Sequence, residues 1–80
     1  MEQEIFIKTP FIKLGNLLKL ADVMESGGMV KMIIQDGLVR LNGHICTQRG
    51  KKVVPNDIVE VSLEPNVFHI RVLQEQEEEL

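Results

Sequence analysis

Lysine and arginine side chains gather in a few places along this sequence of 80 residues, and they are its clearest candidates for chemistry. Three of them fall within four residues, in the segment Arg49-Gly50-Lys51-Lys52. Lys13, Lys31 and Arg40 lie upstream of that segment. Cationic side chains gathered in this way can bind a polyanion through its phosphate oxygens. We therefore predict an anion-binding face drawn from residues 13 to 52.

The acidic and basic residues are unevenly distributed, although the formal net charge of the chain is −3. Residues 8–52 contain eight basic and three acidic residues, whereas residues 53–80 contain one basic and seven acidic residues. Exposed charges more than about 8–10 Å apart are screened at physiological salt, so the acidic half need not cancel the basic half. Charge alone leaves open that both halves are ordinary solvated surface.

The residue types of enzyme and metal sites are sparse. Two histidines and the single Cys46 are too few for a zinc site, and no nucleophile–base pair, carboxylate dyad or nucleotide-binding loop is visible. Helix capping explains Ser26 better than nucleophilic chemistry does. We therefore predict a protein that is not an enzyme, with no catalytic residues, metal, cofactor or small-molecule substrate.

The chain carries no signs of export or membrane insertion. No run of about 18 apolar residues is present, and the acidic start, Met1 to Glu4, is unlike a secretory signal. A lone thiol, Cys46, fits a reducing compartment. The prediction is a cytoplasmic protein without a membrane partner.

The elements that must position the cations follow from hydrophobic periodicity. Residues 4–8 predict a short strand, and residues 14–21 an amphipathic helix of about two turns. A second helix begins after the capping residue Ser26 and ends at Asp36-Gly37, because glycine suits the left-handed position after a helix. The period then changes to two, which predicts several strands separated by the Asn42-Gly43 hairpin turn and later turns.

Two helices packed on one face of a small curled antiparallel sheet would bury this pattern, which makes the fold class α+β. We predict one domain over residues 1–73 and a frayed acidic tail over residues 74–80. The expected strands cover residues 38–41, 44–46, 58–63 and 67–73, and residues 47–52 form a basic loop. The three phenylalanines, Phe6, Phe11 and Phe68, are expected in the core, which argues against a base-stacking platform for single strands.

The segment Ser26–Gly43, together with Lys13-Leu14 and residues 54–61, resembles the RNA-binding domain of the ribosomal-protein-S-four type, or alpha-L motif. The resemblance covers about residues 12–61 and is closest to the small stand-alone bacterial members. It implies the alpha-L fold and binding of structured RNA. Gly27 and Met32 stand where family members usually carry basic residues.

Carried over onto this chain, the resemblance implies an RNA-binding face built from a helix N-terminus, which suits phosphate, and from nearby cations. The expected partner is structured RNA, such as ribosomal RNA or a ribosome-assembly intermediate, with ribosomal or assembly proteins nearby. The alternative is a protein-interaction adaptor that uses the acidic C-terminal half and an exposed edge strand at Val67–Leu73. The predicted RNA-binding residues are Lys13, Ser26, Gly27, Gly28, Lys31, Arg40, Arg49, Lys51 and Lys52.

Overall fold

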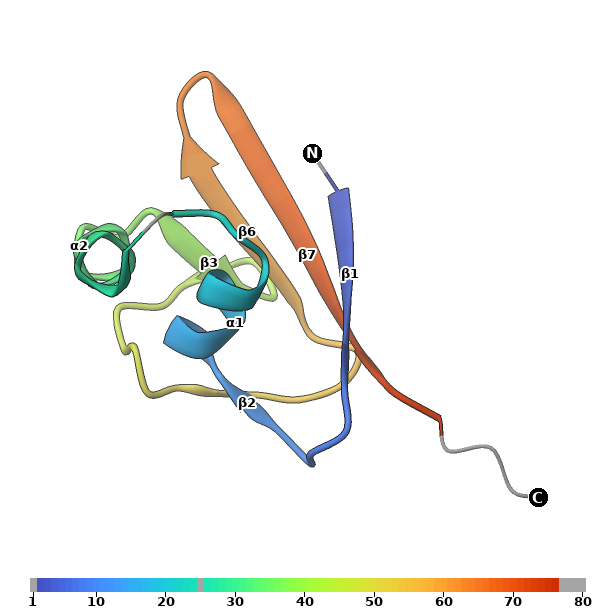
Figure 1. Cartoon of the computed structure of the whole chain (residues 1–80). Coiled ribbons are helices and arrows are strands. Elements are labelled where there is room, and N and C mark those ends of the chain that lie inside the picture. Colours follow the sequence, from blue (N-terminus) through green and yellow to red (C-terminus); the bar gives the residue numbers. More distant parts are fainter. Residues whose placement is uncertain (1, 25, 77–80) are drawn as a thin grey trace.

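The computed structural model describes residues 2–24 and 26–76, which form two helices and seven strands (Figure 1). The helices are α1 (Leu14–Leu20) and α2 (Gly27–Gln35). In chain order the strands are β1 (Glu2–Ile7), β2 (Ile12–Lys13), β3 (Val39–Leu41), β4 (His44–Ile45), β5 (Lys52–Val53), β6 (Ile58–Leu63) and β7 (Asn66–Gln74).

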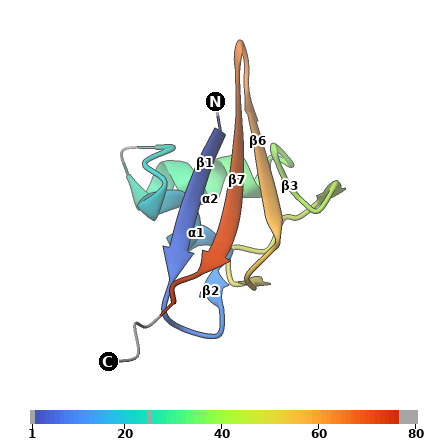
Figure 2. The same cartoon turned by 90° about the vertical axis from the view of Figure 1, so that its right-hand side faces the viewer.

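Five strands form the main sheet in the order β1-β7-β6-β3-β4, and β2 pairs separately with β5. Both helices lie behind one face of the main sheet (Figure 2). We call this covered side the inner face and the opposite side the outer face. The α+β class and the placement of two helices on one side of a small sheet are confirmed.

One strand pair departs from the predicted antiparallel arrangement. The pairs β3–β4, β3–β6 and β6–β7 are antiparallel, but β1 runs parallel to β7. A parallel pair needs a crossover connection rather than a hairpin, and here the whole chain between residues 8 and 65 supplies it. The sheet is therefore mixed, with the first and last strands side by side.

The core lies between the helices and the inner face. Alternate residues of β6 and β7, namely Val59, Val61, Ile70 and Val72, are fully buried there, as the strand period of two requires. Leucines of α1 and the branched residues of α2 cover them; these are Leu14, Leu17, Leu18, Val30, Ile33 and Ile34. Each fully buried aliphatic side chain of this kind contributes about 1.5–3 kcal/mol, so the core fixes how α1 and α2 lie on the sheet.

The predicted start and end of the second helix and the predicted hairpin turn after it are confirmed. The Oγ of Ser26 accepts a hydrogen bond from the N–H of Met29 at 3.2 Å, which caps α2. Gly37 follows α2 with φ +77°. Asn42 and Gly43 both have positive φ, 51° and 86°, as a type I′ hairpin turn requires.

Two sequence predictions about the C-terminal half are wrong. Residues 67–73 do not form an edge strand, because β7 lies between β1 and β6. The frayed tail does not begin at residue 74, because Gln74 ends β7 and the N–H of Glu75 donates to the carbonyl of Ile7 at 2.8 Å. Pairing with a strand 67 residues away holds this segment, and local composition does not reveal such a contact. The last predicted tail residues, 77–80, lie outside the described part of the chain.

The prediction that all three phenylalanines lie in the core is only partly right. Phe68 packs against the core and Phe11 is half-buried, but the Phe6 side chain is 57% exposed. The strand period explains the difference, because Ile5 and Ile7 occupy the inner face and leave Phe6 on the outer face.

Neither α1 nor α2, the helices found in the described residues, has the length and apolar character needed to cross a bilayer.

Candidate nucleic-acid interface

A two-stranded ribbon joins the predicted basic loop to the start of the first helix. In this ribbon β2 and β5 are antiparallel, with Lys13 opposite Lys52. The N–H of Leu14 donates to the carbonyl of Lys51 at 2.8 Å, and the N–H of Gly15 donates to the carbonyl of Arg49 at 2.9 Å. Segments about 35 residues apart are thereby held side by side. These bonds use N–H groups of the first turn of α1, which have no partner within the helix.

A hollow of ≈ 400 Å³ lies beside this junction. Three of its lining residues are cations and none is acidic, so we call it the basic hollow. Gly15 allows the close approach of its walls, because a Cβ atom at this position would lie 2.5 Å from the Cγ of Arg49. The lining residues are Lys13, Gly15, Asn16, Lys19, Arg49 and Gly50.

Lys19 connects the basic hollow to the N-terminus of α2. A Cβ atom on Gly27 would lie 3.1 Å from the Cε and 3.2 Å from the Nζ of Lys19, so this ammonium rests against the first residue of α2. The sequence predictions omitted Lys19. Its position on the polar face of the α1 pattern was the available signal, but that pattern does not reveal which other helix the side chain meets.

The other two loop cations lie toward a different hollow. Lys51 and Lys52 line it together with polar residues of β4 and the following loop, including His44, Thr47 and Gln48. The Nζ of Lys52 also lies 4.7 Å from the centroid of the Phe11 ring, a cation–π contact that positions the ammonium. The loop over residues 46–51 therefore presents cationic side chains on two sides.

The remaining predicted residues are spread more widely. Ser26 and Gly28 are exposed at the start of α2, and Lys31 is exposed further along the helix, outside both hollows. Arg40 is also exposed, but it lies opposite Glu60 in the β3–β6 pair. Since its neighbour Val39 is buried on the inner face, Arg40 belongs to the outer face, away from the helices. The structure therefore separates Arg40 from the basic hollow.

Among the described residues, the cations around the basic hollow form no ion pair with an acid. Within residues 2–24 and 26–76, the ion pairs closer than 4.0 Å are Lys8 with Glu75 and His69 with Glu60. Lys13 and Lys52 are directly opposite each other in the ribbon, and like charges in such a pair are destabilising. A bound anion would relieve this repulsion. The arrangement therefore favours a ligand rich in phosphate.

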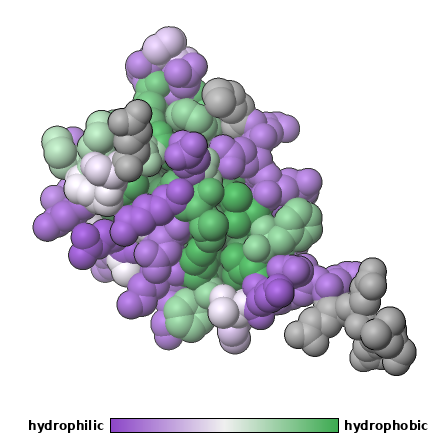
Figure 3. Space-filling view, in the orientation of Figure 1, coloured by the Kyte–Doolittle hydropathy of each residue, from purple (hydrophilic) through white to green (hydrophobic). Residues whose placement is uncertain are grey.

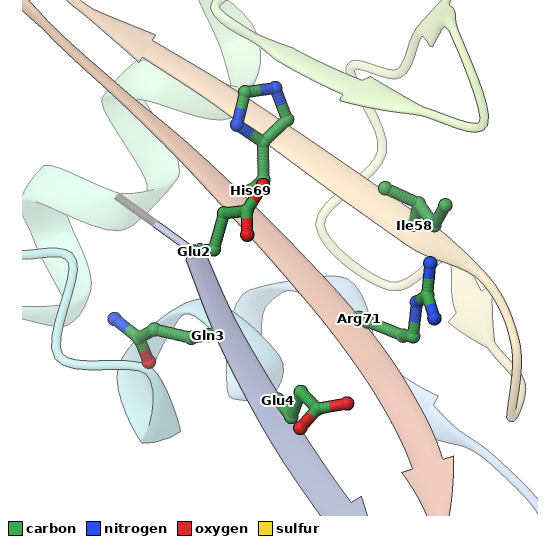
Figure 4. Close-up of a pocket in the computed structure, with 6 residues that line it drawn as sticks. All are labelled: Glu2, Gln3, Glu4, Ile58, His69 and Arg71. Atoms are coloured by element: carbon green, nitrogen blue, oxygen red, sulfur yellow. The ribbon is translucent and has the colours of Figure 1, made fainter.

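A third hollow, of ≈ 510 Å³, lies on the outer face and differs from the basic hollow in charge. Glu2, Glu4, Ile58, His69 and Arg71 extend into it from β1, β6 and β7, whereas Gln3 points away (Figure 4). The amide of Gln3 instead donates to the carbonyl of Ala21 at 3.0 Å, on the helix side. Acidic and basic groups are mixed in this outer hollow, so it offers no concentrated positive charge. Among the described residues no group of three or more His, Cys, Asp and Glu side chains is placed to hold a metal ion.

The α+β fold and the central capped helix and hairpin are those of an S4 domain. The sequence profile of the S4 domain family matches residues 5–71, so the chain belongs to this family. It is also similar to a protein of Bacillus subtilis (strain 168) that bears the name "Probable ribosome maturation protein RlbA". The two sequences are 43% identical over 61 residues, which cover 76% of this chain and 86% of that protein.

Proposed function

We propose that this chain is a non-catalytic RNA-binding protein that holds structured RNA by its phosphates. The observation that carries the proposal is the basic hollow, where the β2–β5 ribbon and α1 bring Lys13, Arg49 and Lys19 together with no acid among its described lining residues. Membership of the S4 domain family supports an RNA ligand.

The contacts expected at this surface orient the RNA and do not read its bases. Cations from β2, α1 and the loop, together with the N–H groups at the start of α2, would bind successive phosphates, and such contacts fix the register of the RNA while carrying little sequence information. RNA helices are recognised chiefly by shape and by backbone groups. A folded RNA that presents phosphates on a curved path therefore fits better than a linear sequence motif.

Ribosomal RNA, or an intermediate of ribosome assembly, is the specific ligand that we propose. The support is the similarity to a protein named for ribosome maturation. This ligand would place the chain in the cytoplasm, beside ribosomal or assembly proteins, and its binding requires no reaction at the site.

The test is a salt titration of binding to fluorescently labelled fragments of ribosomal RNA, followed by anisotropy. Binding should weaken steeply as the salt concentration rises, because the cations displace condensed counterions from the RNA. The double variant Lys13→Glu with Arg49→Glu, which reverses two cations of the basic hollow, should bind roughly 100-fold more weakly, since each hydrogen bond to a charged group contributes roughly 1.5–3 kcal/mol. Absence of binding at low salt, or unchanged binding by this variant, would refute the proposal.

A further inference from the structure

The first strand has an unpaired edge. In the described residues β1 pairs with β7 on one side and with no strand on the other (Figure 2). The carbonyl of Ile7 points toward the β7 side, because it accepts the N–H of Glu75 at 2.8 Å. Backbone groups alternate between the two sides of a strand, so those of Glu4 and Phe6 point toward the open edge. This edge can therefore accept another strand.

Apolar side chains flank this edge. Phe6 is 57% exposed on β1, and Ile5 is half-buried between the sheet and the helix layer. A patch of apolar side chains is visible over the region where Figure 1 draws α1 and β1 (Figure 3). An apolar patch rimmed by polar side chains is typical of an interaction surface.

The charge pattern of this edge is self-complementary. In an antiparallel pair of β1 strands, a register centred on Phe6 places Ile5 opposite Ile7 and brings each Glu4 near Lys8 of the other copy, the residue that directly follows β1. The register centred on Glu4 would place two carboxylates opposite each other. Lys8 is available for such a contact, because its side chain is 73% exposed and lies 3.8 Å from Glu75 in a loose ion pair.

We propose that β1 binds β1 of a second copy of this chain, antiparallel and centred on Phe6, which joins two sheets into one. The two phenylalanine rings meet on the outer face, and two Glu4–Lys8 pairs flank them. None of these residues lines the basic hollow, so each copy keeps its own basic hollow. The interface consists of two short strands and is small, so we expect a weak and concentration-dependent dimer.

The test is sedimentation equilibrium of the full chain over a wide concentration range, without RNA. The average mass of the wild type should rise from 9.1 kDa toward twice that value as the concentration increases. Lys8→Glu should weaken association at least about fivefold, because like charges directly opposite each other are destabilising. The charge-swapped variant Glu4→Lys with Lys8→Glu should restore association, since the opposite pairs re-form.

Two controls separate this interface from other causes. Glu75→Gln removes the existing partner of Lys8 within the chain and should leave association unchanged. Circular dichroism of every variant checks that the fold is retained. A wild type that stays monomeric at about 1 mM would overturn the proposal, because the charged residues would then serve only to keep the edge unpaired. Association that is indifferent to the Lys8→Glu change, or that the charge swap fails to restore, would overturn it as well.

Discussion

The basic hollow on the helix side and the hollow on the outer face are similar in size, but the first is lined by cations alone among its charged residues and the second by acids and bases together. Three cations line the first without an acid, whereas Glu2 and Glu4 accompany Arg71 and His69 in the second. A polyanion interacts with local charge, because distant charges are screened. The two surfaces therefore differ in whether acidic residues lie beside the cations, and not in their size.

The strongest test of this difference is a matched pair of charge reversals. Arg49→Glu and Arg71→Glu change the net charge equally, but only the first alters the basic hollow. We expect Arg49→Glu to weaken RNA binding roughly 10- to 100-fold, since a hydrogen bond to a charged group contributes about 1.5–3 kcal/mol. Arg71→Glu should change it less than about twofold. Equal losses in fluorescence anisotropy would mean that only the net charge matters.

Lys13→Glu should separate binding from stability, because the two effects have opposite signs. The change replaces the repulsion between Lys13 and Lys52 with an attraction, so stability should rise by about 0.2–1 kcal/mol. RNA binding should fall about tenfold, because a cation is lost from the basic hollow. Urea unfolding and anisotropy measure the two effects, and a loss of both stability and binding would contradict this account.

Gly15→Ala tests the close contact between α1 and the loop. The new Cβ atom would lie 2.5 Å from the Cγ of Arg49, and this flexible side chain would have to move. We expect RNA binding to weaken about fivefold through the displaced guanidinium, and stability to fall by about 1–3 kcal/mol, because the clashing Cγ lies next to the backbone of Arg49 rather than at the far end of its side chain. In an Arg49→Ala background the same change should have no effect on binding, and a persistent loss would show that Gly15 acts in another way.

Ser26→Ala should have the smallest effect, on stability. Loss of the hydrogen bond to the N–H of Met29 should cost about 1 kcal/mol and lower Tm by roughly 4–8 °C. Ser62→Ala, which removes a hydroxyl from β6, is the matched control and should shift Tm by less than about 2 °C. Similar shifts of Tm for both variants in calorimetry would show that the Ser26 cap does not stabilise α2.

Local sequence signals predicted the centre of the molecule well. The cap at Ser26, the glycine stop at Gly37 and the Asn42-Gly43 turn depend on neighbouring residues, so they can be identified from short segments. Contacts between distant segments were missed. The β2–β5 ribbon has only two residues in each strand, too few to show a period, yet it brings Lys13 beside the loop.

The same reasoning explains where the structure places the predicted site residues. Arg49 and Lys13 were chosen for charge and proved to be neighbours, whereas Arg40 lies on the outer face because of strand alternation beside Val39. Lys19 was missed because its importance arises from contact with Gly27 on another helix. In this chain, charge identified candidates and tertiary packing decided which of them meet.

The parallel pairing of β1 with β7 also has a consequence for the order of folding. Glu2 to Ile7 pair with His69 to Gln74, so the sheet closes only through contacts between residues 67 positions apart. Contacts of such high sequence separation slow folding, because a long loop must be ordered first. During synthesis, the first strand must wait for nearly the whole chain to emerge. Until then the apolar residues of β1 stay without their final neighbours, so this strand is open to aggregation until β7 has formed.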